Sequence, residues 1–90
     1  MTEDNGVRSA RQKVETLTIG NIVVDIWETV VNEGNKAYYD ASISRKYYSN
    51  DEVRYSPNFR QRDFGNLLLA LFDARAAIRD YIYDFESKGA

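Results

Sequence analysis

The hydrophobic pattern of this chain changes its period once, after Phe59, and that change limits the folds that it can adopt. Between Val14 and Phe59, apolar side chains recur mainly at every second residue, which is the spacing of a strand with one buried face. From Phe64 to Phe85 they recur at steps of three and four residues, which is the spacing of a helix. The pattern therefore predicts an α+β domain, in which several strands are followed by one long C-terminal helix that covers one face of the sheet.

Turn sequences divide the first part of the chain into four strands. Gly20-Asn21, "NEGN" at 32–35 and "SNDE" at 49–52 are rich in the residues that form tight turns. Short turns join neighbouring antiparallel strands, so we expect a four-stranded antiparallel meander. Pro57 cannot donate to a ladder, which indicates that the fourth strand lies at an edge or is bulged. The expected strands cover residues 14–20, 22–31, 36–49 and 53–59.

The chain is short enough for a single domain. Residues 1–13 are polar and without period, and we expect a flexible N-terminal tail there. Residues 14–86 form the ββββα domain, and residues 87–90 are expected to be a frayed C-terminus. Within the first expected strand, Val14 falls out of step with the alternation of Leu17 and Ile19.

The helix is apolar all round at residues 67–72, "LLLALF". A helix with one face on a sheet and the other in water needs only an apolar stripe. If Leu68, Leu71 and Ile78 face the sheet, apolar side chains are left over on the other side, and such leftover area commonly marks a protein interface. We therefore expect a homodimer that packs through this helix. Its expected interface residues are Leu69, Phe72 and Ala76.

The composition makes several classes of function improbable. The chain has no cysteine and no histidine, so it lacks a thiolate nucleophile and the commonest general base and metal ligand. No glycine-rich phosphate loop or metal-ligand motif is present in the sequence, and we expect neither an enzyme nor a cofactor nor a metal. No apolar run approaches the roughly 20 residues that span a bilayer. The first residues, "MTEDNGVRSARQK", lack the apolar core of a signal peptide, so we expect a cytoplasmic protein.

Positive charge and aromatic side chains are concentrated in one block. Residues 36–62 carry six basic and three acidic groups, whereas residues 1–35 carry three and six, and residues 63–90 carry three and five. The three sums are +3, −3 and −2, which give the net charge of −2. Six of the twelve aromatic residues lie in the same basic block. Aromatic rings that stack on unpaired bases, together with cations that contact phosphates, are typical of single-stranded nucleic-acid binding.

The strand order, with the helix last, resembles that of the positive-cofactor-four type of transcriptional coactivator over residues 14–85. "IGNIVVDIWE" is similar to the second-strand signature of that family, and the match rests on Gly20, Val24, Asp25, Ile26 and Glu28. Where that family has a tryptophan at the start of its helix, no tryptophan follows Pro57 here. The resemblance implies a small domain that binds single-stranded DNA and dimerises through its C-terminal helix.

By this resemblance, the sheet face turned away from the helix is the expected working surface. We expect a single-stranded DNA or RNA to bind there with weak sequence preference and strong salt dependence, in an accessory role in transcription or replication. The expected binding residues on the face are Trp27, Tyr38, Lys46, Tyr48 and Arg54, with Lys36, Arg45, Arg60 and Arg62 at its rim.

Two other interpretations explain the same residues. Tyrosine is common in strands for its own sake, and charges at a sheet edge commonly serve to block aggregation. Tyr and Arg are also enriched at the energetic centres of protein interfaces. The alternative function is therefore a non-enzymatic protein–protein interaction module that uses the Tyr/Arg-rich sheet face.

Overall fold

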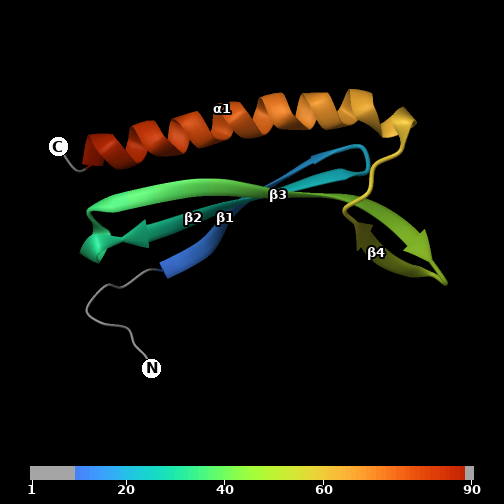
Figure 1. The fold of residues 1–90 in the computed structure, drawn as a ribbon, viewed down its shortest axis with the longest axis horizontal. Coiled ribbons are helices and arrows are strands. Elements are labelled where there is room, and N and C mark those ends of the chain that lie inside the picture. The colour runs from blue at the N-terminus through green and yellow to red at the C-terminus, as the bar shows by residue number, and fades with distance from the viewer. Residues whose placement is uncertain (1–9, 89–90) are drawn as a thin grey trace.

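The computed structural model describes residues 10–88, which form four strands and one long helix (Figure 1). The sheet order is β1-β2-β3-β4, and every neighbouring pair is antiparallel. The predicted α+β fold, a four-stranded meander followed by one C-terminal helix, is confirmed. The elements are β1 (Ala10–Ile19), β2 (Ile22–Val31), β3 (Lys36–Ser49), β4 (Glu52–Ser56) and α1 (Phe64–Lys88), with short 3-10 helices at Asn32–Gly34 and Gln61–Asp63.

Both ends of the domain extend further than predicted. Residues 10–13, expected in the tail, continue β1 and pair with β2 as far as Val30. Backbone pairing rather than apolar burial holds this segment, so it left no hydrophobic alternation in the sequence. Residues 87 and 88, expected to be frayed, belong to α1. The rest of the expected tail and of the frayed end, residues 1–9 and 89–90, lies outside the described residues.

A β-bulge accounts for the position of Val14. The register of β1 against β2 shifts between Lys13 and Glu15, so the intervening Val14 is the extra residue of the bulge. The helix meets the sheet at this irregularity. The Tyr81 hydroxyl lies 3.3 Å from the carbonyl oxygen of Val14 and donates a hydrogen bond to the Glu15 carboxylate at 2.9 Å.

Backbone geometry explains the order of residues in two turns. Gly20, the first central residue of the β1–β2 hairpin, has φ of +59°, as the first position of a type II′ turn requires. A Cβ at this position would lie 2.5 Å from the side-chain nitrogen of Asn66, so close packing against the helix also favours glycine. Asn50 and Asp51 both have positive φ, as in a type I′ hairpin between β3 and β4.

The fourth strand is shorter than predicted. It ends at Ser56, directly before Pro57, and it lies at the edge of the sheet, where a missing N–H is tolerated. Phe59, expected at the end of this strand, lies beyond it and packs against the core. A segment that carries the chain from the sheet up to the helix thus begins at the proline (Figure 1).

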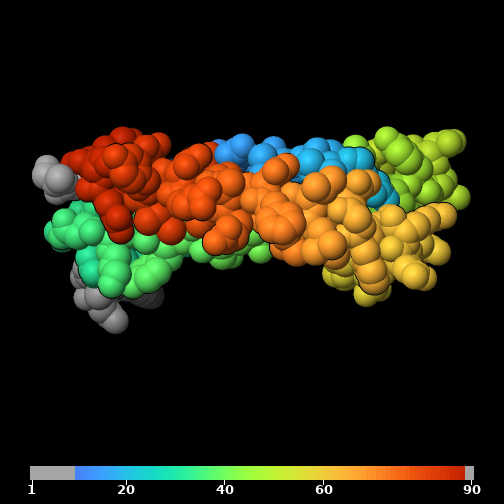
Figure 2. All heavy atoms as spheres, turned by 90° about the horizontal axis from the view of Figure 1, so that it is seen from above, coloured from blue at the N-terminus to red at the C-terminus, as the bar shows by residue number. Residues whose placement is uncertain are grey.

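The core lies between β2 and α1. Ile22, Val24 and Ile26 are fully buried on one face of β2, and Ala70 and Ala74 of α1 are packed against them. Alanine at these two helix positions lets the helix backbone approach the sheet closely. Seen from the helix side, α1 runs along most of the length of the sheet, the β3–β4 hairpin extends beyond its first turn, and no other element lies over it in this view (Figure 2).

This packing corrects the expected orientation of the helix. Leu68 and Leu71 were expected to face the sheet, but both are exposed, and Ala70 and Ala74 take that place. Ile78 does pack against the core, together with Leu67 and Tyr81. Residues 67–72 are apolar on every side of the helix, so this stretch gave no pattern that identified the side facing the sheet.

Candidate nucleic-acid interface

Strand register assigns each strand residue to one of two sheet faces. The buried residues of β2 face α1, so their neighbours Val23, Asp25 and Trp27 lie on the opposite side, which we call the open face. Residues paired with these positions share that face. Besides those three, the charged, aromatic and hydroxyl-bearing members of the open face are Arg11, Lys13, Thr16, Thr18, Thr29, Lys36, Tyr38, Asp40, Ser42, Ser44, Lys46, Tyr48 and Tyr55.

The register places five of the expected binding residues on the open face: Trp27, Lys36, Tyr38, Lys46 and Tyr48. The two tyrosines are well exposed, at 54% for Tyr38 and 70% for Tyr48. They stand ten residues apart on one strand, which is about 33 Å at the rise of a strand. Their separation is long enough for several nucleotides to lie between them.

Trp27 is held by its neighbours. The Arg11 guanidinium carbon lies 4.2 Å from the centroid of its ring, and the indole N–H donates to the Ser42 hydroxyl at 2.8 Å. Arg11 also pairs with Asp40 at 3.1 Å. A base that stacks on this indole therefore has to displace the guanidinium. The Lys36 ammonium likewise lies 5.5 Å from the centroid of the Tyr38 ring, whereas the Tyr48 ring is 70% exposed.

The expectation that Arg54 lies on the open face is wrong. It pairs across the strands with Tyr47, on the side of the sheet that carries the helix, and it binds Glu52 at 2.9 Å. The assignment failed because it depended on the register of the last hairpin. Tyr55, the next residue, is the one that reaches the open face, opposite Lys46.

Arg45 was expected at the rim of the open face, but its contacts place it elsewhere. Its side chain is only 13% exposed and lies on the helix side of the sheet. It donates to the carbonyl of Asn58 at 2.9 Å and lies 3.7 Å from the Asp63 carboxylate. Arg45 is therefore part of the junction between β3 and α1 and is not available to a ligand on the open face.

Arg60 and Arg62 are exposed, but neither belongs to a strand of the open face. They lie in the segment between β4 and α1, where the chain rises to the helix (Figure 1). The backbone N–H of Arg60 donates to Asp63 at 2.9 Å. These two guanidinium groups remain candidates for phosphate contacts only at the end of the sheet.

Sequence reasoning missed three residues of the open face: Arg11, Lys13 and Tyr55. The first two lie in the segment that was assigned to the tail. Their basic character was visible in the sequence, but their place beside Trp27 depends on the extension of β1 past the bulge. Tyr55 was visible as a strand tyrosine, and only the register of β4 decides which face it takes.

The electrostatics of the open face are mildly positive. It carries four cations, Arg11, Lys13, Lys36 and Lys46, against the two carboxylates of Asp25 and Asp40. Both carboxylates take part in ion pairs, since Arg11 pairs with Asp40 and Lys13 lies 3.6 Å from Asp25. Within residues 10–88, no carboxylate lies at ion-pair distance from Lys36 or Lys46. The face thus offers two lysines that an anion meets without breaking an ion pair, and one of them, Lys36, lies over the ring of Tyr38.

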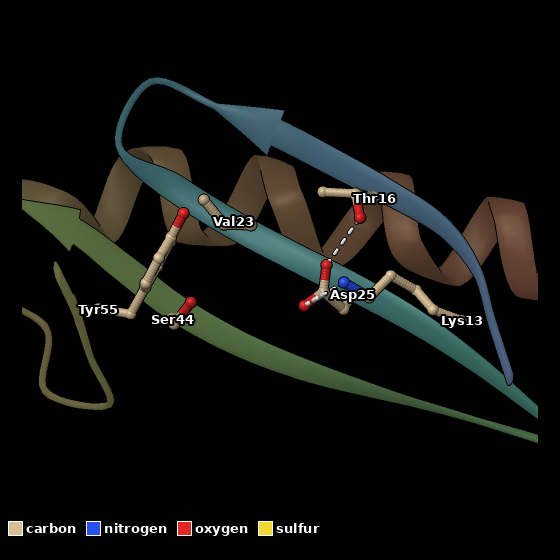
Figure 3. Close-up of a pocket in the computed structure, with 6 residues that line it drawn as sticks. All are labelled: Lys13, Thr16, Val23, Asp25, Ser44 and Tyr55. Atoms are coloured by element: carbon tan, nitrogen blue, oxygen red, sulfur yellow. Dashed lines mark hydrogen bonds and ion pairs between the residues drawn. The ribbon is translucent and has the colours of Figure 1, made fainter. Parts of the chain in front are cut away.

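A pocket of about 420 Å³ opens on this face (Figure 3). Tyr55 forms one end, where its side chain reaches over β3 toward Val23, and the Asp25 carboxylate with its two partners forms the other (Figure 3). The Thr16 hydroxyl donates to that carboxylate at 2.7 Å. Its lining residues are Lys13, Thr16, Val23, Asp25, Ser44 and Tyr55.

Two tyrosine–glutamate pairs lie on the other side of the sheet, against the helix. Tyr39 donates to Glu28 at 2.6 Å, Tyr81 donates to Glu15, and the two rings stack at 5.8 Å. Burial, followed by the bond to Glu28, holds the pKa of Tyr39 well above its usual value, and burial with the bond to Glu15 raises that of Tyr81. Both hydroxyls remain protonated donors at neutral pH, and they serve to hold the helix on the sheet.

The outward side of α1 carries the expected dimer residues. Leu69 and Phe72 are 55% and 65% exposed, whereas Ala76 is half-buried. Two shallow depressions of about 290 and 250 Å³ lie along this side, lined by leucines with Phe64 in the first and with Phe72 and Arg75 in the second. We call the exposed side chains of this region the helix apolar surface, and they are Phe64, Leu68, Leu69, Leu71 and Phe72.

Within residues 10–88, the structure contains neither a cluster of metal-binding side chains nor a membrane-spanning helix. Among residues 10–88, no three carboxylate side chains are grouped so that they are able to hold a metal ion. In the same part of the chain, α1 is too polar to cross a bilayer.

Comparison with known protein families, with characterised proteins and with solved structures finds no match to this chain. Its function therefore has to be argued from the open face and from the helix apolar surface.

Proposed function

We propose that the protein binds single-stranded nucleic acid along the open face of its sheet. The observation that carries this proposal is that three exposed tyrosines share one face with Lys36 and Lys46, two lysines that form no ion pair within residues 10–88. Tyr38, Tyr48 and Tyr55 offer rings on which unpaired bases stack, at about 1–3 kcal/mol for each base. In a duplex the bases are already stacked on one another, so we expect much weaker binding of double-stranded DNA.

The charge of the face predicts how strongly salt weakens binding. Two of its four cations are ion-paired, so the other two neutralise about two phosphates without breaking an ion pair within the protein. Each phosphate contributes about 0.7 to the slope of log affinity against log salt for a single strand, which gives a slope of about −1.4. This is a modest value, consistent with the acidic composition of the chain. Stacking on sequence-tolerant rings predicts weak base preference over most of the bound strand.

The test is fluorescence anisotropy of labelled single-stranded DNA, single-stranded RNA and duplex DNA at low and high salt. We expect Tyr48→Ala to weaken single-strand binding by roughly 5- to 160-fold, the equivalent of one lost stacking contact of about 1–3 kcal/mol. Tyr83→Ala is the matched control, because Tyr83 is as exposed as Tyr48 but belongs to α1. Equal losses in the two variants, or no binding to any oligonucleotide at low salt, would contradict the proposal.

A protein-binding role for the same face is the second candidate. The observation that favours it is the pairing of Arg11 with Asp40 and of Lys13 with Asp25, which leaves a tyrosine-rich surface of low net charge. Tyrosine-centred protein contacts weaken less with salt than phosphate contacts do. A ligand that binds the open face with almost no salt dependence would therefore support this alternative.

The proposal includes a homodimer that packs through the helix apolar surface. Among residues 10–88, only five apolar side chains are buried: Ile22, Val24, Ile26, Ala70 and Ala74. Small domains bury a low fraction of their surface, and a second copy supplies the missing burial. A single apolar patch on one helix meets itself across a twofold axis, which makes an isologous interface. Such a dimer leaves both open faces uncovered, because they lie on the other side of the sheets.

A further inference from the structure

We propose that the pocket on the open face takes one guanine base of the bound strand. The inference rests on the proposed single-strand binding and adds a base preference at one position. The pocket of about 420 Å³ lies within the size range of sites that bind small molecules. The pocket opens on the face along which the nucleic-acid strand is proposed to run. A base that turns toward the sheet therefore enters it directly.

The pocket has an apolar part and a polar end. Val23 lies on its floor, and Tyr55 stands 59% exposed at one end. In Figure 3 the tyrosine side chain extends from β4 across β3 toward Val23. An aromatic ring beside an aliphatic side chain is the kind of surface on which a base stacks. The opposite end is occupied by Asp25.

The polar end presents an acceptor next to a cationic donor. One oxygen of Asp25 accepts from Thr16 at 2.7 Å, and the other lies 3.6 Å from the ammonium group of Lys13. An ionised carboxylate has about four acceptor positions, so two are left after these contacts. The Asp25 side chain is 28% exposed and that of Lys13 is 47% exposed, so both remain accessible to a ligand.

This arrangement matches the pairing edge of guanine better than that of any other base. Guanine carries two adjacent N–H donors, at N1 and N2, beside the O6 acceptor. The carboxylate of Asp25 accepts from the two donors, and the Lys13 ammonium donates to O6. Adenine and cytosine set a ring-nitrogen acceptor beside their amino group, and that acceptor faces the carboxylate lone pairs. Thymine and uracil have one N–H between two carbonyls, so a second partner is lost. An unmatched polar group in such a site is the usual source of discrimination.

The test compares oligothymidylates that differ only at a single central position. We expect a central guanine to bind roughly 5- to 10-fold more tightly than thymine or adenine, at the low end of the discrimination that a bidentate contact gives. Adenine is the control for the larger stacking area of a purine. Inosine lacks the N2 amino group and is expected to lose most of the gain, a comparison that requires no change in the protein.

Two variants locate the effect on the protein. Asp25→Asn removes the acceptor pair, so we expect the preference for guanine to fall to less than about twofold while thymidylate binding persists. Asp40→Asn is the matched control, because Asp40 is an ion-paired carboxylate elsewhere on the same face. If the four oligonucleotides bind equally, the guanine inference fails and the proposed function stands.

The pocket is also tested without a nucleic-acid strand. Titration of the amide resonances with guanosine monophosphate is expected to shift Asp25, Ser44 and Tyr55, whereas adenosine and uridine monophosphates at the same concentration leave them in place. If no oligonucleotide binds, the proposed function fails, and this titration decides the pocket separately. If guanosine monophosphate leaves these resonances unshifted, the inference is overturned.

Discussion

The Asp63 carboxylate, at the junction of sheet and helix, is the only acidic side chain among residues 10–88 that is buried. It accepts from the backbone N–H of Arg60 at 2.9 Å and from the side-chain amide of Asn21 at 3.3 Å, and Arg45 lies 3.7 Å away. The backbone hydrogen bond is the chief cause that lowers its pKa, with Asn21 and Arg45 acting in the same direction against the effect of burial. One residue thereby fastens the start of α1 to β3 and to the first hairpin.

The lowered pKa of Asp63 predicts acid sensitivity. A carboxyl whose pKa is lower in the folded state stabilises that state above its unfolded value of about 3.9, and this stabilisation is lost as the pH falls through the folded value. We expect Asp63→Asn to melt at a lower temperature than the wild type at pH 7 and to show a shallower decline of melting temperature below pH 4. Asp73→Asn, at an exposed carboxylate further along α1, is the control for a general change in charge. Parallel melting curves against pH for wild type and Asp63→Asn, measured by circular dichroism, would argue against this role.

At the scale of the secondary-structure elements, the order of strands and helix followed from the sequence, but the rotation of the helix did not. Alternation at period two and the three turn sequences were sufficient to predict the meander, because each is a local signal. The rotation of α1 is decided by which residues allow closest approach to β2. Ala70 and Ala74 face the sheet in place of Leu68 and Leu71, because a small side chain lets the helix and strand backbones approach each other. Hydrophobicity alone does not indicate this preference.

The candidate site, like the fold, was predictable from the sequence only in part. Tyr38, Lys46 and Tyr48 follow from alternation along one strand, and they share the open face as expected. Arg54 was assigned to the wrong face because a shift of one residue in register exchanges the two faces of a strand. The register of β4 depends on how the Asn50–Asp51 turn closes, which is a property of backbone geometry rather than of composition.

Close helix–sheet packing gives the second prediction at this scale. Ala70 is fully buried against β2, so a leucine there has no room and forces the helix away from the sheet. We expect Ala70→Leu to destabilise the fold by about 1–3 kcal/mol, the usual cost of overpacking a core. The exposed Asp80 supplies a control on the same helix, since Asp80→Leu adds a similar side chain outside the core and should change stability by roughly 0.5 kcal/mol or less. Urea denaturation measures both, and an unchanged midpoint for Ala70→Leu would show that the packing is looser than described.

At the scale of the whole molecule, the two surfaces left uncovered differ in chemistry and lie on opposite sides. The open face is mixed in charge and rich in tyrosine, whereas the helix apolar surface consists of leucine and phenylalanine. Nucleic acid has few apolar groups with which the helix apolar surface could pack. A second copy of the chain presents an identical apolar surface to it. The proposed dimer and the proposed binding site are therefore separable by mutation.

The last prediction tests that separation. Phe72→Glu places a charge in the helix apolar surface, where a desolvated and unpaired carboxylate opposes association. We expect sedimentation equilibrium of the wild type to give a mass near twice 10.4 kDa, and that of Phe72→Glu to give 10.4 kDa with an unchanged circular dichroism spectrum. Tyr48→Glu, on the open face, is the control: it should remain dimeric and lose single-strand binding. A wild-type chain that stays monomeric at every concentration would exclude the dimer and leave the exposed leucines and phenylalanines as the surface of a different protein contact.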